Sequence, residues 1–138
     1  MRNTLRINQK VYRSIFWIGY LMVLVAAFVP LKYDLHDKTI NFIAFKFYLD
    51  QVLHAVVYFL ICLYFLAGLL LGLTLFKENS FKKFILAVFI LATITEGVQL
   101  FVPYRVFNFF DWLANVVGIG VGLVVIWLVG GKLVVNSE

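Results

Sequence analysis

Charged residues are scarce in this chain. Only 14% of its 138 residues are Asp, Glu, Lys or Arg, and 64% are hydrophobic, which gives a mean hydropathy of +0.99. Soluble domains average about 25% charged and about 45–50% apolar residues, so this composition excludes an ordinary soluble domain and indicates a membrane protein. The formal net charge of +5 has no soluble basic face on which to gather, and we therefore expect no nucleic-acid partner.

Cysteine, histidine and serine are also scarce, and each shortage removes a class of chemistry. The single cysteine, Cys62, excludes an internal disulfide, and the two histidines leave little room for a metal site of soft ligands. The only serines, Ser14, Ser80 and Ser137, are remote from the polar residues described below, which argues against a serine-based intramembrane protease. Neither HExxH nor a glycine-rich phosphate loop is present, and we expect no metal and no cofactor.

Four long apolar runs dominate the sequence. They cover approximately residues 14–31, 52–76, 84–102 and 112–129, each close to the ~17–25 residues that a membrane helix requires. The runs are continuous and do not alternate as the strands of a membrane barrel do. The sequence therefore predicts an all-α fold, a bundle of four transmembrane helices that forms one membrane domain over residues 1–138.

Lys and Arg are distributed unevenly between the ends of these spans. The excess lies in the N-terminal tail and in the loop between the second and third spans, at Arg2, Arg6, Lys10, Arg13, Lys77, Lys82 and Lys83. Because cytoplasmic loops carry such an excess, we expect both termini in the cytoplasm and residues 32–51 and 103–111 outside. The first run resembles a signal peptide, but its length and poor cleavage site favour an uncleaved span.

The outer segment 32–51 is not plainly polar. Its second half contains Phe42, Phe45, Phe47 and Tyr48, and aromatic residues settle at the headgroup level of a membrane. This composition favours an interfacial or re-entrant loop between the first two helices. An early start of the second helix is the equally weighted alternative.

Polar residues interrupt the second and third spans at helical spacing. Glu96 lies inside the third run, where an ionisable group costs roughly 2.5–3.5 kcal/mol on insertion scales, and Gln99 follows one turn later. In the second span Asp50, His54 and Tyr58 share a face, because residues four apart on a helix lie one above the other. Such expensive polar groups face a protein interior or an aqueous cavity and mark a site.

The last loop and span add three more polar residues. Asp111 suits a helix N-terminus, where its carboxylate caps free N–H groups, and Asn115 follows four residues later. Arg105 either pairs with Glu96 or reaches the lipid headgroups. Together with the topology above, these spacings predict that three helices present polar residues at similar depth toward the outer leaflet.

Two GxxxG patterns accompany the polar residues, Gly68 to Gly72 and Gly118 to Gly122. Glycines at this spacing permit close contact between membrane helices, so an oligomer through these faces is possible. The short linkers predict that consecutive helices are antiparallel neighbours.

At these residues the chain resembles the VanZ-like family of small bacterial membrane proteins. The resemblance covers about residues 50–122 and rests on Asp50, His54 and Tyr58 in one block and on a second block, Glu96, Gln99, Arg105, Asp111, Asn115 and Gly118. Gln51 departs from the family, which commonly has Lys there. The resemblance implies a multi-pass protein of the bacterial plasma membrane with a role in the cell envelope, including resistance to the glycopeptide teicoplanin, to which the founding member is linked.

Three functions are compatible with such a site. We favour binding of a lipid-linked envelope precursor or a glycopeptide-related ligand, whose anionic headgroup would contact Asp50, Gln51, Tyr58, Gln99, Arg105 and Asn115. The alternative is a membrane-embedded hydrolase or transferase that uses His54, Glu96 and Asp111 as its acid and base, with a divalent ion on these residues and Asp50 as a weaker variant. A transporter or proton relay is the third possibility.

Overall fold

In the computed structural model of the chain, residues 8–29, 39–42, 45–103 and 107–136 are described. Four helices follow one another: α1 (Gln9–Ala27), α2 (Leu49–Leu70), α3 (Ser80–Val98) and α4 (Phe109–Asn136). Each is long and apolar enough to cross a membrane, counting for α3 the turn of 3-10 helix η2 (Gln99–Phe101) that extends it. The predicted fold class, an all-α bundle of four membrane-spanning helices, is confirmed.

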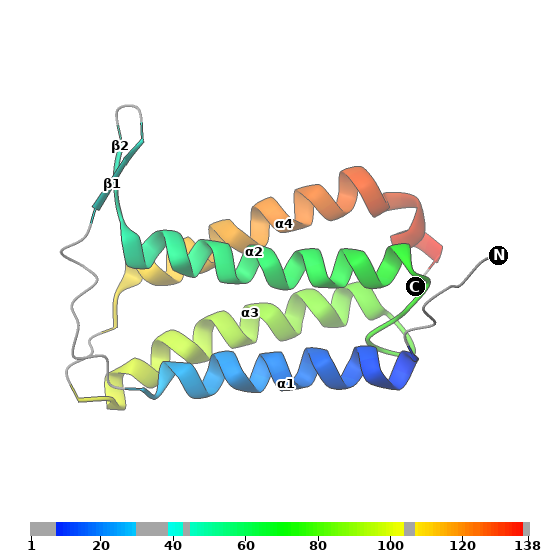
Figure 1. Cartoon of the computed structure of the whole chain (residues 1–138), viewed down its shortest axis with the longest axis horizontal. Helices are drawn as coiled ribbons and strands as arrows, with labels where there is room; N and C mark the ends of the chain where they lie inside the picture. Colours follow the sequence, from blue (N-terminus) through cyan, green and yellow to red (C-terminus); the bar gives the residue numbers. More distant parts are fainter. Residues whose placement is uncertain (1–7, 30–38, 43–44, 104–106, 137–138) are drawn as a thin grey trace.

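The helices run along the long axis of the molecule, and consecutive helices point in opposite directions (Figure 1). The closest packing, however, joins alternate helices, because α2 lies along α4 and α1 packs mainly on α3. Helix α3 also contacts α4, so the two pairs are joined through these two helices. The start of α1 and the end of α4 lie at one end of the bundle, and the starts of α2 and α4 lie at the other.

The close pairing of α2 and α4 depends on the second glycine pattern. A Cβ added at Gly118 would lie 2.1 Å from the carbonyl oxygen of Ala55, and one at Gly122 would lie 2.3 Å from Cβ of Cys62. In lipid the association of helices depends on such close packing, because there is little hydrophobic gain between helices. The prediction that this GxxxG permits close helix contact is confirmed within the chain.

The first glycine pattern works differently from the prediction. Gly68 is buried against the phenol ring of Tyr12 in α1, but Gly72 has a φ of +70° and lies beyond the end of α2. The N–H groups of Gly72 and Leu73 donate to the carbonyls of Leu69 (3.0 Å) and Gly68 (2.8 Å), which is the Schellman arrangement that ends a helix at a glycine. Helix α2 therefore ends at Leu70, six residues before the predicted boundary at 76.

Aromatic rings and several polar contacts hold helix α1 in the bundle. The ring of Tyr12 stacks on that of Tyr64, with centroids 5.0 Å apart, and Phe16 lies 6.2 Å from Phe84. At the start of the helix Nε of Arg13 donates to the carbonyl oxygen of Thr74 at 2.9 Å. These contacts tie α1 to α2, to α3 and to the turn that follows α2.

The aromatic segment before α2 forms a β-hairpin, which the sequence analysis did not predict. Strand β1 (Thr39–Phe42) pairs antiparallel with β2 (Phe45–Tyr48), and α2 begins directly afterwards at Leu49. The alternative of an early helix is therefore wrong for the strand residues, whose β-branched and aromatic side chains suit a strand. A position of this hairpin at the membrane interface, or a re-entrant path of the loop, stays a prediction, and residues 30–38 and 43–44 lie outside the described residues.

We predict that Gly118→Ala destabilises the bundle, because its methyl group would meet the backbone of α2. The expected loss is roughly 1–3 kcal/mol, the range for overpacked cores, measured by unfolding in detergent micelles monitored by circular dichroism. Gly120→Ala is the matched control, since no described atom lies within 4 Å of a Cβ built there. Equal losses in the two variants would contradict the assigned role of Gly118.

Candidate polar site at the ends of three helices

Three polar side chains from three different helices meet near the end of the bundle where α2 and α4 begin. Glu96 of α3 and Asn115 of α4 are completely buried, whereas the side chain of His54 in α2 keeps 26% of its surface exposed. The prediction that α2, α3 and α4 present polar residues at similar depth is reproduced by these three residues.

A chain of hydrogen bonds joins the three side chains. Nδ2 of Asn115 donates to Oε1 of Glu96 at 3.0 Å, and Oδ1 of Asn115 lies 3.0 Å from Nδ1 of His54. Oε1 of Glu96 also lies 3.5 Å from the same imidazole nitrogen. The amide of Asn115 therefore bridges the carboxylate of α3 and the imidazole of α2, so that one buried side chain holds three helices together.

The bridge also determines the tautomer of His54. Nδ2 of Asn115 donates to Glu96, so the amide oxygen, which can only accept hydrogen bonds, faces His54. Nδ1 of the neutral imidazole must then carry the hydrogen, which leaves a lone pair on Nε2. Because His54 is the only partly exposed side chain of these three, a ligand would meet this imidazole first.

One turn from His54 along α2, a second polar contact joins α2 to α3. The hydroxyl of Tyr58 lies 3.0 Å from Oγ1 of Thr95, and both residues are buried. Oγ1 of Thr95 also donates to the carbonyl of Ala92 at 3.2 Å, which leaves the phenol as donor in the contact with Thr95. Thr95 was missed in the sequence analysis, although its position beside Glu96 on the same helix was a signal.

The start of α4 differs in detail from the prediction for Asp111. The capping residue is Asn108, whose Oδ1 accepts from the N–H of Phe110 at 3.0 Å. Asp111 lies three residues later in the first helical turn, is buried, and accepts from Nδ2 of Asn108 at 3.1 Å. Its position still favours a negative charge near the positive end of the helix dipole. The capping pattern Asn-x-x-Asp could have identified Asn108 from the sequence.

Of the remaining predicted residues, those that the structure describes lie at or near helix ends. Oδ1 of Asp50 accepts from the backbone N–H of Gln51 at 2.9 Å at the start of α2, where both side chains are half-buried. Gln99 is buried in η2, after the last turn of α3. Arg105, predicted either to pair with Glu96 or to reach the headgroups, lies outside the described residues.

The weaker variant of the enzyme hypothesis placed a divalent ion on Asp50, His54, Glu96 and Asp111. Within the described part of the chain, no three His, Cys, Asp or Glu side chains gather closely enough to hold a metal ion. His54 and Glu96 approach each other, but Asp111 is held by Asn108 at the start of α4. The geometry does not support this variant.

The fold and the buried polar chain define a class of protein: a multi-pass helical membrane protein with a His–Asn–Glu hydrogen-bonded site near one end of its bundle. The model of the family described as VanZ/LLP1 matches residues 15–130, which is most of the chain, and the chain belongs to this family. The match extends beyond residues 50–122, on which the resemblance was recognised. Comparisons with curated proteins and with solved structures give no match.

We predict that Asn115 and His54 are energetically coupled, because the amide is the partner of the imidazole. In a double-mutant cycle with Asn115→Ala and His54→Ala, the coupling free energy should be about 0.6–1.7 kcal/mol, as for hydrogen bonds between membrane helices. Unfolding in micelles measures it. The control cycle pairs Asn115→Ala with Ser14→Ala, an exposed residue of α1. It should be additive, and additivity in both cycles would argue against the bridge.

Proposed function

We propose that the polar site binds the anionic headgroup of a membrane lipid, such as a lipid-linked precursor of the cell envelope, at the outer leaflet. The observation that carries this proposal is the buried chain His54–Asn115–Glu96, in which only the imidazole remains partly exposed. The buried members hold the imidazole in one orientation. Its Nε2 can accept from a headgroup hydroxyl, or donate to a phosphate once the ring is protonated.

Other residues extend the recognition of the headgroup in this proposal. The guanidinium of Arg105 suits a phosphate because its fork of donors matches the phosphate oxygens. Asp50, Gln51 and Gln99, which lie at or near the helix ends around the centre, supply further polar groups. Gln51, which stands where the family commonly has Lys, contributes an amide without a positive charge, so Arg105 takes the larger part in holding an anion.

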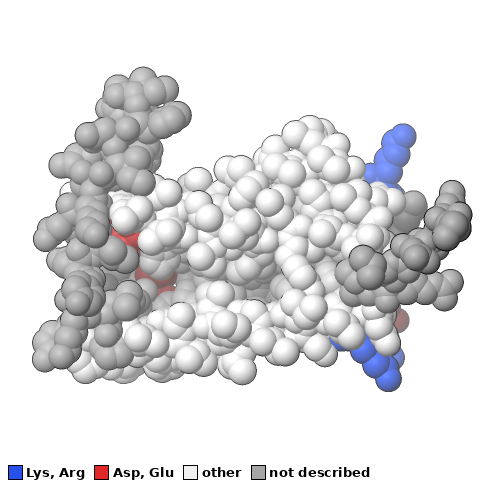
Figure 2. All heavy atoms as spheres, in the orientation of Figure 1, with Lys and Arg blue, Asp and Glu red and all other residues white. Residues whose placement is uncertain are grey.

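The outward orientation of the site is part of the proposal and is supported by the distribution of charge. Among the residues coloured in Figure 2, the basic side chains lie at one end of the bundle, with one carboxylate beside them, and further carboxylates lie toward the other end. The basic residues include Lys82, Lys83 and Lys132, on the side where α3 starts and α4 ends. Since cytoplasmic ends of membrane proteins carry the excess of Lys and Arg, we place both termini in the cytoplasm of a bacterial cell and the site at the opposite face.

Introduced cysteines test this orientation, and the buried position of Cys62 leaves the background low. We predict that Phe107→Cys reacts with a membrane-impermeant maleimide in intact cells, because this exposed residue precedes α4 at the outer end. Lys77→Cys, also exposed but at the other end, should react only after the cells are permeabilised. Labelling in the reverse order would place the site in the cytoplasm and contradict the proposal.

Native mass spectrometry tests the binding itself. With phosphatidylglycerol or a polyprenyl phosphate as the probe, we predict that the double variant Arg105→Ala, Glu96→Gln retains roughly tenfold less lipid than the wild type, because charge-assisted hydrogen bonds contribute about 1.5–3 kcal/mol. The control is Glu78→Gln, an exposed carboxylate between α2 and α3. Equal retention by wild type, control and double variant would refute the headgroup proposal.

The tautomer of His54 favours one second candidate, a hydrolase or transferase acting on an envelope lipid. An imidazole whose Nδ1–H is held by a partner, and whose Nε2 is free to take a proton, is the arrangement of a general base. Asn115 occupies the orienting position here, with Glu96 behind it and only 3.5 Å from Nδ1. Glu96 or Asp111 would supply the acid in such a reaction.

Turnover separates the two candidates. If the protein is an enzyme, His54→Gln should lower the rate of product formation from a radiolabelled lipid precursor by roughly 10²–10⁴-fold, the usual contribution of a general base. His36→Gln, at the only other histidine of the chain, is the matched control. A wild-type protein that retains the lipid and leaves it unchanged would refute the enzyme and keep the binding function.

A role in the cell envelope follows from the same proposal, since the outer-leaflet site would hold a lipid-linked precursor of the cell wall. Membership in the VanZ/LLP1 family supports the idea that this role includes lowered susceptibility to teicoplanin. Occupation of the polar site by the precursor, or by a glycopeptide-related ligand, would be the physical basis of that effect.

A further inference from the structure

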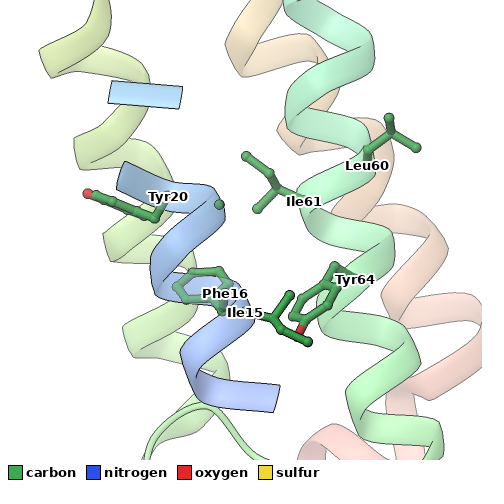
Figure 3. A pocket seen from close by; sticks show the side chains of 7 residues that line it. Ile15, Phe16, Tyr20, Leu60, Ile61 and Tyr64 are labelled. Atoms are coloured by element: carbon green, nitrogen blue, oxygen red, sulfur yellow. The ribbon is translucent and has the colours of Figure 1, made fainter. Parts of the chain in front are cut away.

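An open groove lies between α1 and α2, on the side of the bundle where these two helices diverge. Its volume is about 230 Å³, and seven residues line it: Ile15, Phe16, Gly19, Tyr20, Leu60, Ile61 and Tyr64. Figure 3 shows α1 and α2 facing each other across it, with Ile61 and Phe16 turned into the gap. The groove exists because α1 packs on α3 while α2 packs on α4, so the described residues leave the space between α1 and α2 open.

The lining offers little to a polar occupant. The only polar side-chain atoms are two phenol oxygens, and both already donate hydrogen bonds to backbone carbonyls, Tyr20 to Ala87 at 3.1 Å and Tyr64 to Tyr12 at 2.8 Å. In Figure 3 the hydroxyl of Tyr20 points away from α2. All other lining atoms are hydrocarbon or backbone, and both helices have the length and hydropathy of membrane spans, so the occupant that the surroundings supply is a hydrocarbon chain.

The groove lies further along α2 than the polar site, and one of its lining residues, Ile61, shares a helix face with that site. His54, Tyr58 and Ile61 follow one another at spacings of four and three, so they lie one above the other. From His54 to Tyr64 the helix rises about 15 Å at 1.5 Å per residue. This distance equals half of the ~30 Å hydrocarbon thickness of a bilayer, which is the depth reached by one acyl chain whose headgroup lies at the surface.

The far end of the groove is closed. The ring of Tyr12, one turn before Phe16 on α1, stacks on Tyr64 with centroids 5.0 Å apart. At the middle of the groove Gly19 adds width, because no described heavy atom lies within 4 Å of a Cβ built there. A dry apolar cavity of about 150 Å³ is enough to bind benzene, so this larger space has room for several carbons of a lipid tail.

We propose that the groove between α1 and α2 binds an acyl chain of the lipid whose headgroup occupies the His54–Asn115–Glu96 site. The proposal rests on the function proposed above for that headgroup. The polar site would then select the lipid by its head, and the groove would hold one tail along the bundle, from the depth of Tyr58 down to the Tyr12–Tyr64 stack.

A photoreactive lipid tests this proposal. The probe is phosphatidylglycerol with a diazirine midway along one acyl chain, reconstituted with the full-length protein in vesicles and irradiated, and the labelled residues are mapped by mass spectrometry. We expect the labels to concentrate on residues 15–20 and 60–64, and not on the exposed face of α4 around Trp127 and Leu128. Labels spread evenly over all exposed apolar residues would overturn the proposal.

Two glycine variants make the test specific. Gly19→Leu adds a side chain at a residue that lines the groove, where a Cβ meets no described heavy atom within 4 Å. It should lower labelling at residues 60–64 roughly fivefold, because the displaced tail loses its packing contacts. Gly120→Leu adds the same side chain to the exposed face of α4, where the surroundings are equally open, and should leave labelling unchanged. Unchanged labelling in Gly19→Leu would also overturn the proposal.

Asn115→Ala separates a failure of the groove from a failure of the headgroup site. If Asn115→Ala lowers lipid retention in native mass spectrometry while Gly19→Leu leaves labelling unchanged, the groove proposal is wrong and the headgroup site stands. If Gly19→Leu abolishes the labelling while Asn115→Ala retains lipid as the wild type does, the groove binds a tail and the headgroup proposal is wrong.

Discussion

A carboxylate buried among membrane helices must receive its hydrogen bonds from the protein, and this requirement organises the structure around Glu96. One donor is the amide of Asn115, which comes from α4 and reaches α2 through its carbonyl oxygen. Since a hydrogen bond needs a separation near 3 Å, α2, α3 and α4 must approach one another closely at this level. The glycines at 118 and 122 make the approach of α4 to α2 possible, so the packing motif and the polar site support each other.

The same pairing has a consequence on the other side of the molecule. Helix α2 packs on α4, and aromatic rings and Arg13 hold α1 to α3 and to the turn after α2. A groove therefore remains between α1 and α2. The hydrogen-bonded site of His54, Asn115 and Glu96 and the apolar groove therefore both follow from one arrangement of helices. In the function that we propose, the polar residues would face a lipid headgroup at the membrane surface and the groove would hold its hydrocarbon tail.

Much of this arrangement could be predicted from the sequence, for identifiable reasons. Apolar length and helical period are local properties. Apolar length predicted the four spans, and helical period together with the charge-based topology predicted the convergence of His54, Glu96 and Asn115. The end of α2 was misplaced because Leu73, Leu75 and Phe76 are as apolar as a helix interior, whereas the end is determined by the positive φ of Gly72. The bridging role of Asn115 depends on which helices are neighbours, and the close α2–α4 pair is not visible in the order of the chain. The hairpin at 39–48 was missed because hydrophobicity alone does not separate a short aromatic strand from the start of a helix.

The most direct test of the central claim is the tautomer of His54 in the membrane, measured by ¹⁵N NMR of histidine-labelled protein in lipid bilayers, with His36→Gln used for assignment. We predict that the neutral form of the ring carries its hydrogen on Nδ1, because Nδ1 faces the carbonyl oxygen of Asn115 and the carboxyl group of Glu96, and that Asn115→Ala shifts this form toward the Nε2–H tautomer. A ring that carries its hydrogen on Nε2 in the wild type, and does not change in Asn115→Ala, would contradict the hydrogen-bonded chain described here.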